Sequence, residues 1–471
     1  MGKFVRWLGI YHQMLADPRS GGRRSYWANR KDWECLGRNN YDLKDVMDMT
    51  EFEHIYSVFG IPIGAPDDAH GKVRGFVDAW NSQCKKALSP GWCLVIDESM
   101  VKWRGRGMPG KIFVPRKPEP CGMEGKTTAC GLSKCMLHFD MQEGKNRMGD
   151  KKYNKEYGRS VGCTLRCVDS WAGQGKIVFA DSWFGSPKAA IALAQRGLFC
   201  IMNVKGAARK GFPMERMQEN VSQDKRIFSL MSSFTINDEE WSLVAGGHQE
   251  KNPMFLISTA STMHMGDDRR FKIFFLDDNG TEQTSIVTYT TTEMHGAYRK
   301  YFNRIDLHNR DRQENFYFAE VLITNDWSKR VIWELWGCTL VNVHFTLQYF
   351  YGAHYRNMCV QQFKDAMAMG LMYNPWIIAE RIDRPIVQGS HTLVRMPARK
   401  SNPKLMVNTI CRYCKQCTSY YCEQCTRKNN ITAYFGVCNV GIRMCWANHV
   451  ENVPTPRNRA RGGSLKRARL Q

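Results

Sequence analysis

A stretch near the C-terminus carries more potential metal ligands than an ordinary hydrophobic core would hold. Between residues 411 and 449 lie seven cysteines and one histidine, namely Cys411, Cys414, Cys417, Cys422, Cys425, Cys438, Cys445 and His449. Two Cys-x2-Cys pairs in this stretch have the spacing that lets two thiolates share one tetrahedral Zn²⁺, and eight ligands suffice for two closed sites. So short and polar a segment cannot bury enough apolar surface to fold alone. Residues 411–449, the Cys-rich module, are therefore predicted to fold around zinc.

The remaining cysteines are scattered, and nothing in the sequence points to an oxidising compartment. Arg6 and His12 interrupt the apolar N-terminal stretch, and no small-residue cleavage site follows, so we expect no secretory signal. The most apolar long stretch, Leu335–Ala353, contains His344 and other polar side chains. It is better explained as a buried helix than as a membrane span. We expect a soluble intracellular protein without a membrane anchor, whose 18 cysteines are thiols or metal ligands.

The chain is strongly basic, with 67 Lys and Arg against 45 Asp and Glu and a formal net charge of +22. Such a charge creates a long-range field that attracts polyanions, so we expect a nucleic-acid partner. A structural RNA-binding factor, or a basic protein at a membrane surface, would have the same composition. The basic run at residues 457–469 fits a nuclear import signal, a clamp on the DNA backbone or a plain terminal tail.

Hydrophobic spacing and turn residues divide the chain into segments. They are a helical region (1–90), the first part of an α/β core (91–205), a β-rich insertion or set of extra strands (206–290), a helical part of the core (291–375), a Pro/Arg-rich linker (376–410), the Cys-rich module (411–449) and a basic tail (450–471). Within the core, the strand 176–180, the helix 187–196 and the strand 198–204 follow one another with short links. This order predicts an α/β layer.

Two aspartates stand at the ends of predicted strands. Asp97 directly follows the run Cys93–Ile96, and Asp181 directly follows Ile177–Ala180. If the two strands are neighbours in one sheet, these carboxylates meet at the same edge and can supply oxygen ligands for Mg²⁺ or Mn²⁺. A pair of such ions about 4 Å apart can activate a water and stabilise the leaving 3′-oxygen of a phosphodiester.

A site of this kind needs a third carboxylate, and sequence spacing leaves Glu293, Asp306 and Asp311 open. The first aspartate is followed by a basic stretch that could contact a DNA backbone. Its cations are Lys102, Arg104, Arg106, Lys111, Arg116 and Lys117. The aromatic residues Trp103 and Phe113 lie among them, which suits occasional base stacking. A solvated charged hairpin around a core tryptophan is the alternative explanation.

Three blocks of sequence resemble the piggyBac-type transposases. The block Val95–Arg106, continuing through Ile112–Pro118, is similar to the family's first catalytic block. Val178–Pro187 is similar to the block at its second aspartate, and Tyr301–Asn309 is a weaker match to the block at the third. The Cys-rich module resembles the family's C-terminal cross-brace zinc finger. Cys417 is surplus to that finger's usual spacing, so the choice among Cys411, Cys414 and Cys417 stays open.

The resemblance implies an RNase H-like catalytic core with a β-rich insertion, in which Asp97, Asp181 and Asp306 form the metal-binding triad and Asp306 lies on a helix. It also implies a nuclear DNA transposase that cuts and pastes. Such an enzyme hydrolyses the element ends, passes through hairpin intermediates and joins 3′-OH groups to TTAA targets. Two element ends must be paired, so a homodimer is expected.

Two positions depart from the family's pattern. Asn309 stands where the family has a further aspartate, and a neutral amide binds Mg²⁺ less strongly than a carboxylate does. Arg304 replaces a glycine, which is expected to place a bulky cation beside the metal ligands. Both departures favour the alternative function, a domesticated DNA-binding or chromatin protein that keeps the fold without cleavage.

Overall fold

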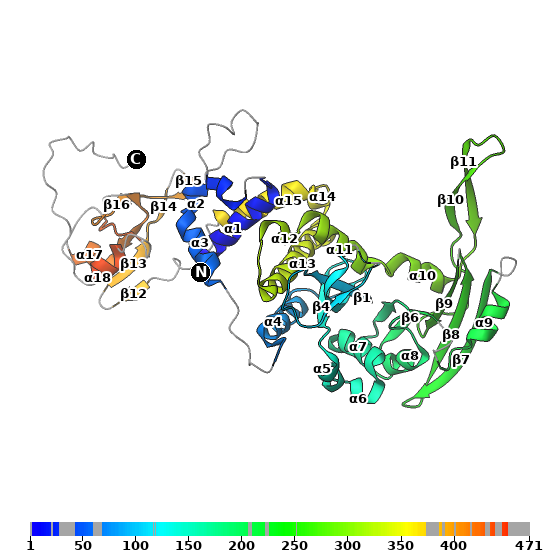
Figure 1. Ribbon diagram of the computed structural model, residues 1–471. Coiled ribbons are helices and arrows are strands. Elements are labelled where there is room, and N and C mark those ends of the chain that lie inside the picture. The colour runs from blue at the N-terminus through cyan, green and yellow to red at the C-terminus, as the bar shows by residue number, and fades with distance from the viewer. Residues whose placement is uncertain are drawn as a thin grey trace. The chain divides into compact units, whose positions relative to one another are not determined.

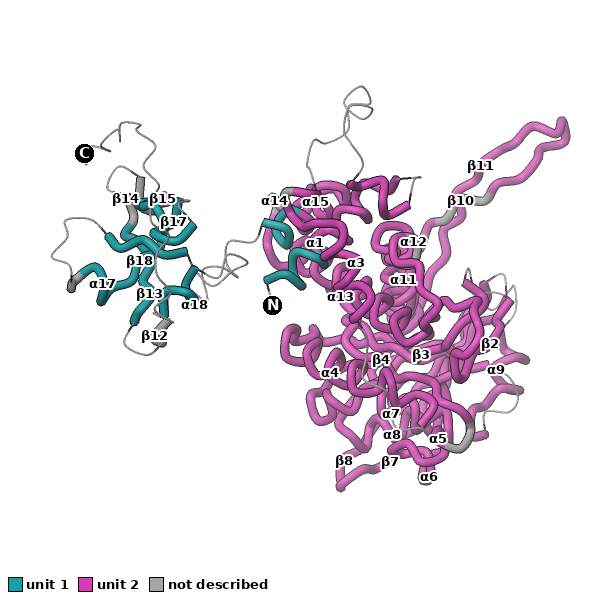
Figure 2. Tube along the Cα trace, turned by 60° about the vertical axis from the view of Figure 1, so that its left-hand side comes forward, with its two compact units in different colours: residues 1–8, 369–471 teal, residues 9–368 magenta. Residues whose placement is uncertain are grey.

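The computed structural model divides the chain into two compact units (Figure 2). Unit 2 is Gly9–Ala368, and unit 1 is Met1–Leu8 together with Met369–Gln471. The structure describes residues 2–19, 22–27, 43–59, 68–115, 117, 119–205, 210–221, 226–250, 252–373, 386–388, 391–399, 402–414, 417–428, 434–438 and 445–450. The basic tail beyond residue 450 and the linker residues 376–385 lie outside this range.

A single mixed sheet of nine strands forms the centre of unit 2 (Figure 1). The strands are β1 (Cys93–Lys102), β2 (Lys111–Phe113), β3 (Cys121–Cys130), β4 (Met136–Met141), β5 (Ile177–Ala180), β6 (Phe199–Val204), β7 (Ile227–Ile236), β8 (Glu239–Gln249) and β9 (Pro253–Ser258). Their order is β2-β3-β1-β5-β6-β9-β8-β7, and β4 pairs with β3. The expected mixed α/β class is therefore confirmed.

The strands that carry the aspartates are neighbours. β1 and β5 run parallel, with Ile96 opposite Ala180, and β3 runs antiparallel to β1 on its other side. One strand boundary was predicted wrongly, because β1 continues past Ile96 to Lys102 and Asp97 lies inside it. The reason is that β3 supplies hydrogen-bond partners along the whole length of β1, including Thr127 opposite Asp97.

Helices cover both faces of this sheet. They include α5 (Lys145–Asp150), α6 (Asn154–Tyr157), α7 (Arg159–Val168), α8 (Pro187–Ala194), α9 (Met214–Asn220), α10 (Glu293–Tyr301) and α11 (Arg304–Asn315). Side chains alternate between the two faces of a strand. Leu94 and Ile96 of β1 accordingly pack in the core with α7 and α8, whereas Val95 packs with α10 and α11 through Tyr298 and Ile305. Asp97 has the parity of Val95, so its side chain lies on the α10–α11 face.

The predicted buried helix is the longest helix in unit 2. It is α13 (Trp327–Phe350), and residues such as Leu335 and Val341 are almost fully buried. The other helices around it are α1 (Gly2–Ala16), α2 (Leu43–Val46), α3 (Met49–Val58), α4 (Gly71–Ala87), α12 (Phe318–Val321), α14 (Ala353–Arg356) and α15 (Val360–Met372). None of the helices in the described ranges is long and apolar enough to span a membrane.

Residues 206–290 contribute strands to the central sheet and also form a separate hairpin. β7, β8 and β9 extend the central sheet, because β9 pairs antiparallel with β6. These strands match the extra-strand interpretation of this segment. The following strands, β10 (Arg269–Leu276) and β11 (Glu282–Tyr289), instead form a separate two-stranded hairpin that projects from the body of unit 2 (Figure 1).

The C-terminal part of unit 1 is small and built from short elements. They are β12 (Ile386–Gln388), β13 (His391–Arg395), β14 (Ala398–Arg399), β15 (Asn402–Met406), β16 (Thr409–Ile410), β17 (Cys417–Thr418), β18 (Tyr420–Cys422), α17 (Glu423–Lys428) and α18 (Cys445–Val450). The predicted linker 376–410 is wrong for its second half. β13 pairs with β18 of the Cys-rich module, so backbone hydrogen bonding makes this stretch part of the folded unit.

A buried ion pair fixes α11, the helix of Asp306, to α13. The Arg312 guanidinium donates to the Glu334 carboxylate, and both side chains are almost fully buried. Removing one partner leaves an uncompensated buried charge, so we expect Glu334→Ala to lower the free energy of unfolding by about 3–5 kcal/mol. Chemical denaturation measures this change. The exposed control Glu215→Ala should stay within about 0.5 kcal/mol of wild type, and an equally small effect of Glu334→Ala would contradict the prediction.

Candidate functional site

The first two candidate ligands lie at the same edge of the central sheet. Asp97 is half-buried in β1, and its Oδ1 accepts a hydrogen bond from the Glu98 N–H at 2.8 Å. Asp181 follows β5, and its Oδ1 accepts from the Trp183 N–H at 2.8 Å. This second bond shapes the turn that leads to α8, which begins with the capping side chain of Ser186. The backbone thus orients both carboxylates through one oxygen each.

The third carboxylate comes from the first turn of α11. Asp306 is exposed there, and its charge acts on Asp97. Burial, the Asp306 charge and the Asp181 charge together raise the pKa of Asp97 to about 7, against a smaller lowering by the Glu98 N–H and Lys117. Asp306 and Asp181 thus both lie close enough to Asp97 for their charges to raise its pKa. The crowding of negative charge at Asp97 is what a bound divalent cation would relieve.

The other two carboxylates that spacing left open lie elsewhere. Asp311 accepts a hydrogen bond from Asn315 Nδ2 at 2.6 Å, and its Oδ2 lies 3.7 Å from His344 Nδ1 of α13. Glu293 begins α10 and is exposed. Neither is among the charges that act most strongly on Asp97. Of the three carboxylates that spacing left open, Asp306 is the one whose charge acts on Asp97 most strongly.

The aspartate site is more open than a single-ion cage. In the described ranges, three groups of His, Cys, Asp and Glu have ligand atoms that all lie within 4.8 Å of one another. Two of them are clusters in unit 1, and the third is Asp140 with Cys163 and Cys167. The three aspartates do not form so tight a group.

Asn309 and Arg304, which depart from the family pattern, both form hydrogen bonds with other residues of the chain. Asn309 Oδ1 accepts from Ser99 Oγ at 3.0 Å, and Asn309 Nδ2 donates to the Glu98 carbonyl at 3.3 Å. This amide ties α11 to β1. The expectation that Arg304 puts a cation beside the metal ligands is wrong, because its Nε donates to the Gly131 carbonyl at 2.9 Å. The backbone turn at Gly131 binds the guanidinium instead.

A buried lysine beside the site was not predicted. Lys126, on β3, is only 1% exposed; its Nζ lies 2.6 Å from Glu98 Oε1 and 3.9 Å from the centre of the Trp183 ring. Lys117 approaches the same carboxylate, with Nζ 3.5 Å from Glu98 Oε2. Glu98 and Trp183 directly neighbour the backbone that positions Asp97 and Asp181. No sequence pattern marks Lys126, because only the β1–β3 register brings it opposite Glu98.

The basic residues after Asp97 have different surroundings. Arg104, Arg106 and Lys111 are exposed, and Phe113 on β2 is 67% exposed. Lys102 Nζ pairs with Glu119 Oε1 at 2.5 Å, and Arg116 lies outside the described residues. Trp103 is buried and donates to the Arg106 carbonyl, so it is a core residue rather than a stacking platform.

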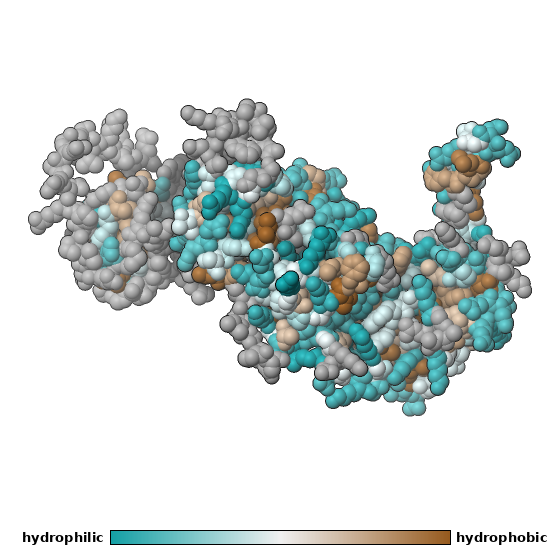
Figure 3. Space-filling view, in the orientation of Figure 1, coloured by the Kyte–Doolittle hydropathy of each residue, from teal (hydrophilic) through white to brown (hydrophobic). Residues whose placement is uncertain are grey.

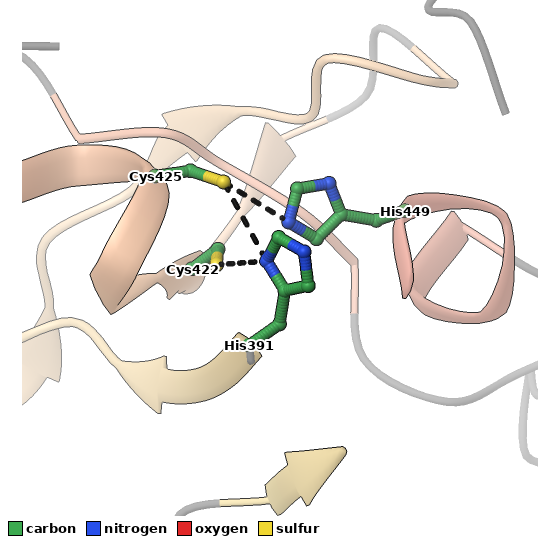
Figure 4. A group of neighbouring side chains, drawn as sticks. All are labelled: His391, Cys422, Cys425 and His449. Atoms are coloured by element: carbon green, nitrogen blue, oxygen red, sulfur yellow. Dashed lines mark hydrogen bonds between the residues drawn. The ribbon is translucent and has the colours of Figure 1, made fainter. Parts of the chain in front are cut away.

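Two clusters of ligand atoms organise the C-terminal unit. The mixed cluster, His391, Cys422, Cys425 and His449, is drawn in Figure 4. His391 Nδ1 lies 3.4 Å from Cys422 Sγ and 3.6 Å from Cys425 Sγ, and His449 Nε2 lies 3.5 Å from Cys425 Sγ. A tetrahedral Zn²⁺ with ordinary bond lengths holds such atoms about 3.4–3.8 Å apart. The donor set and its spacing fit zinc.

The second cluster consists of Cys411, Cys414, Cys438 and Cys445. The sulfurs of Cys414 and Cys438 are 3.4 Å apart. Burial and the neighbouring sulfurs raise the pKa of Cys438 and of Cys445, so four thiolates cannot coexist here without a cation. A Zn²⁺ ion would supply that charge, and four cysteines are a common structural ligand set for this ion.

Seven of the eight candidate ligands in the Cys-rich module join a cluster, and the eighth does not. Cys417 is exposed on β17 and belongs to neither group. His391, which the sequence assigned to a linker, takes the remaining place because Leu393 of β13 pairs with Cys422 of β18. Two four-ligand sites need eight ligands, so a count could have shown that one ligand was missing. It could not have shown which distant histidine supplies it.

Comparisons with known proteins agree with this geometry. The family model described as Transposase IS4 matches residues 10–344, more than two-thirds of the 471-residue chain. The chain belongs to this transposase family. The fold of this transposase resembles a solved structure described as a piggyBac transposase synaptic complex with hairpin DNA, with a TM-score of 0.56 at 16% identity. The match covers 82% of this chain and 74% of that one. No curated protein matches the sequence.

The family and the fold together confirm the expected likeness to piggyBac transposases. All three aspartates, including Asp306 on α11, lie within the matched residues 10–344. The two C-terminal clusters lie beyond them, apart from the rest of this transposase in sequence and in unit. Their ligand sets are those of metal sites.

Proposed function

We propose that this transposase is a DDE-type enzyme that cuts DNA strands and transfers their 3′ ends with the help of Mg²⁺ or Mn²⁺. The observation that carries the proposal is that burial, together with the charges of Asp306 and Asp181, raises the pKa of Asp97 to about 7. We assign the sheet and helices around them to the RNase H-like core that the sequence resemblance implies. Phosphodiester cleavage is the chemistry that such carboxylates serve in a basic protein.

Each carboxylate has a defined part in this proposal. When bound, a pair of divalent ions supplies an activated water and stabilises the leaving 3′-oxygen. Backbone hydrogen bonds to Oδ1 of Asp97 and to Oδ1 of Asp181 orient these two carboxylates, which would be ligands of the ions. Asp306 belongs to the first turn of α11, where its side chain is exposed to solvent. The open side of the site is where a DNA strand would lie.

The surface next to the site supports DNA as the substrate. The exposed cations Arg104, Arg106 and Lys111 follow Asp97 in the chain and would contact backbone phosphates, and the exposed ring of Phe113 could stack on a base. Lys117 lies close enough to Asp97 to lower its pKa, so it would face the scissile phosphate. The solved structure with the similar fold is itself a complex with hairpin DNA.

We further propose that the mixed cluster and the four-cysteine cluster each hold one Zn²⁺. The ligands alternate along the chain between the two clusters: His391, then Cys411 and Cys414, then Cys422 and Cys425, then Cys438 and Cys445, then His449. This interleaving is the cross-brace arrangement that the sequence resemblance implies. A unit so small needs such metal staples to fold. Recognition of element ends is its proposed role, in a nuclear homodimer that pairs two ends and targets TTAA sites.

A catalytically inactive, domesticated DNA-binding protein is the second candidate function. The observation that favours it is Asn309, whose Oδ1 accepts hydrogen bonds from Ser99 and Arg312 and is thereby committed to the protein. The same bonds, however, give Asn309 a structural use that leaves Asp97, Asp181 and Asp306 in place. We therefore rank the active enzyme first.

A cleavage assay separates the two functions. Purified protein is incubated with Mn²⁺ or Mg²⁺ and DNA that carries the sequence flanking its own gene, and nicked and hairpin products are resolved on denaturing gels. Asp97→Ala and Asp306→Ala should each reduce cleavage on the order of a thousandfold or more. Asp311→Asn is the matched control, because this neighbour on α11 is turned toward His344 and should retain activity. Equal product from wild type and Asp97→Ala would eliminate the enzyme.

A further inference from the structure

The β10–β11 hairpin is a built element that leaves apolar side chains in water. Phe274 and Leu276 of β10 are 65% and 69% exposed, and Ile286 of β11 is 63% exposed. The hairpin projects from unit 2 and carries an apolar patch below a polar tip (Figure 3). Its turn is well defined, because Asp277 Oδ1 accepts from the N–H groups of Asn279 and Thr281. Exposed apolar groups on an ordered arm indicate a binding surface.

One face of the hairpin is self-complementary. The register places Lys272 opposite Ile286, Phe274 opposite Thr284 and Leu276 opposite Glu282, and strand geometry puts all of these on the same face. From base to tip this face therefore carries the cations Arg270 and Lys272, then apolar groups, then the anion Glu282. Lys272 and Glu282 are both exposed.

We propose that this face is a dimerisation surface on which the hairpins of two copies pack antiparallel about a two-fold axis. Such an axis near Phe274 brings Lys272 of each copy to Glu282 of the other and buries the apolar residues between them. A two-fold interface uses the same surface on both copies, so charges of opposite sign at its two ends are required. Duplex DNA fits this face less well, because Asp278 and Glu282 at the tip oppose phosphate.

The outer edges of β10 and β11 would also let a second copy form backbone hydrogen bonds with the hairpin. In the described ranges, β10 pairs only with β11, and neither strand joins the central sheet. A lone two-stranded ribbon is marginally stable in water, and burial of one face against a second copy would stabilise it. The inference concerns assembly, so it stands whether or not the aspartate site cleaves DNA.

A charge-exchange experiment on the full-length protein tests the proposal by analytical ultracentrifugation without DNA. Wild type should sediment as a dimer at micromolar concentration. Lys272→Glu and Glu282→Lys should each weaken the dimer at least about tenfold, because like charges then face each other twice. An equimolar mixture of the two variants should restore a dimer, since a mixed pair has opposite charges at both contacts.

Apolar substitutions and a DNA measurement complete the test. The double variant with Phe274→Ser and Leu276→Ser should sediment as a monomer with an unchanged far-ultraviolet circular dichroism spectrum. Ile323→Ser, at a residue of unit 2 that is 75% exposed, is the matched control and should remain dimeric. A monomeric wild type would overturn the proposal. So would single charge reversals that leave the dimer intact or that weaken only DNA binding.

Discussion

Removal of zinc is expected to unfold the C-terminal unit while the central sheet of unit 2 stays folded. The two four-ligand clusters join β13, β18, α17 and α18, and few other apolar residues are buried there. Zinc binding in such small units contributes roughly 10–16 kcal/mol at neutral pH, far more than this core could supply. Hydrogen exchange with and without a chelator should show lost amide protection in β13 and β18, and unchanged protection in β1 and β5.

Single substitutions make the same prediction residue by residue. Native mass spectrometry should find two zinc ions in wild type and one in His391→Ala, although His391 lies outside the predicted Cys-rich module. Cys417→Ser is the control, because this exposed cysteine belongs to neither cluster, and it should retain both ions. Zinc lost from Cys417→Ser but kept by His391→Ala would contradict the assignment.

Asp97→Asn is expected to abolish cleavage and yet stabilise the metal-free protein at high pH. Folding raises the pKa of Asp97 to about 7 from an ordinary value of 3.8, mainly through burial and the charge of Asp306. A carboxyl with a raised pKa binds its proton more tightly when folded, so its contribution to stability is lost as pH rises from about 4 to 7. At pH 8 the cost reaches about 4 kcal/mol, which asparagine would not incur.

The measurement is denaturant unfolding in a chelator at pH 5 and at pH 8. The gain from Asp97→Asn should be large at pH 8 and small at pH 5, and Mg²⁺ should stabilise wild type more than the variant. Asp150→Asn, at a largely exposed side chain, serves as control and should change little at either pH. A variant that is less stable than wild type at pH 8 would show that burial and the neighbouring charges do not destabilise the ionised Asp97 carboxylate.

Much of the aspartate site follows from local sequence. A short apolar run followed by aspartate recurs at Asp97 and Asp181, and both aspartates follow the segment in which β1 and β5 pair in parallel. The predicted end of β1 was too early, but this error does not change the sheet face on which the Asp97 side chain lies, because Asp97 keeps its place in the alternation of the strand. Lys126 could not be predicted. Its position depends on the register of β3 against β1, and no local pattern encodes register between strands far apart in the chain.

The sequence by itself determined the ligand pairs that are close in the chain. Cys422 and Cys425 share a cluster because three residues of a turn or helix place two side chains within one metal's reach. Spacing alone left Asp306, Asp311 and Glu293 open, and only the tertiary structure showed that the Asp306 charge acts on Asp97 and that His391, not Cys417, joins the mixed cluster. The physical reason is that helix direction and strand pairing, which set these positions, are stabilised by burial and hydrogen bonds summed over many residues.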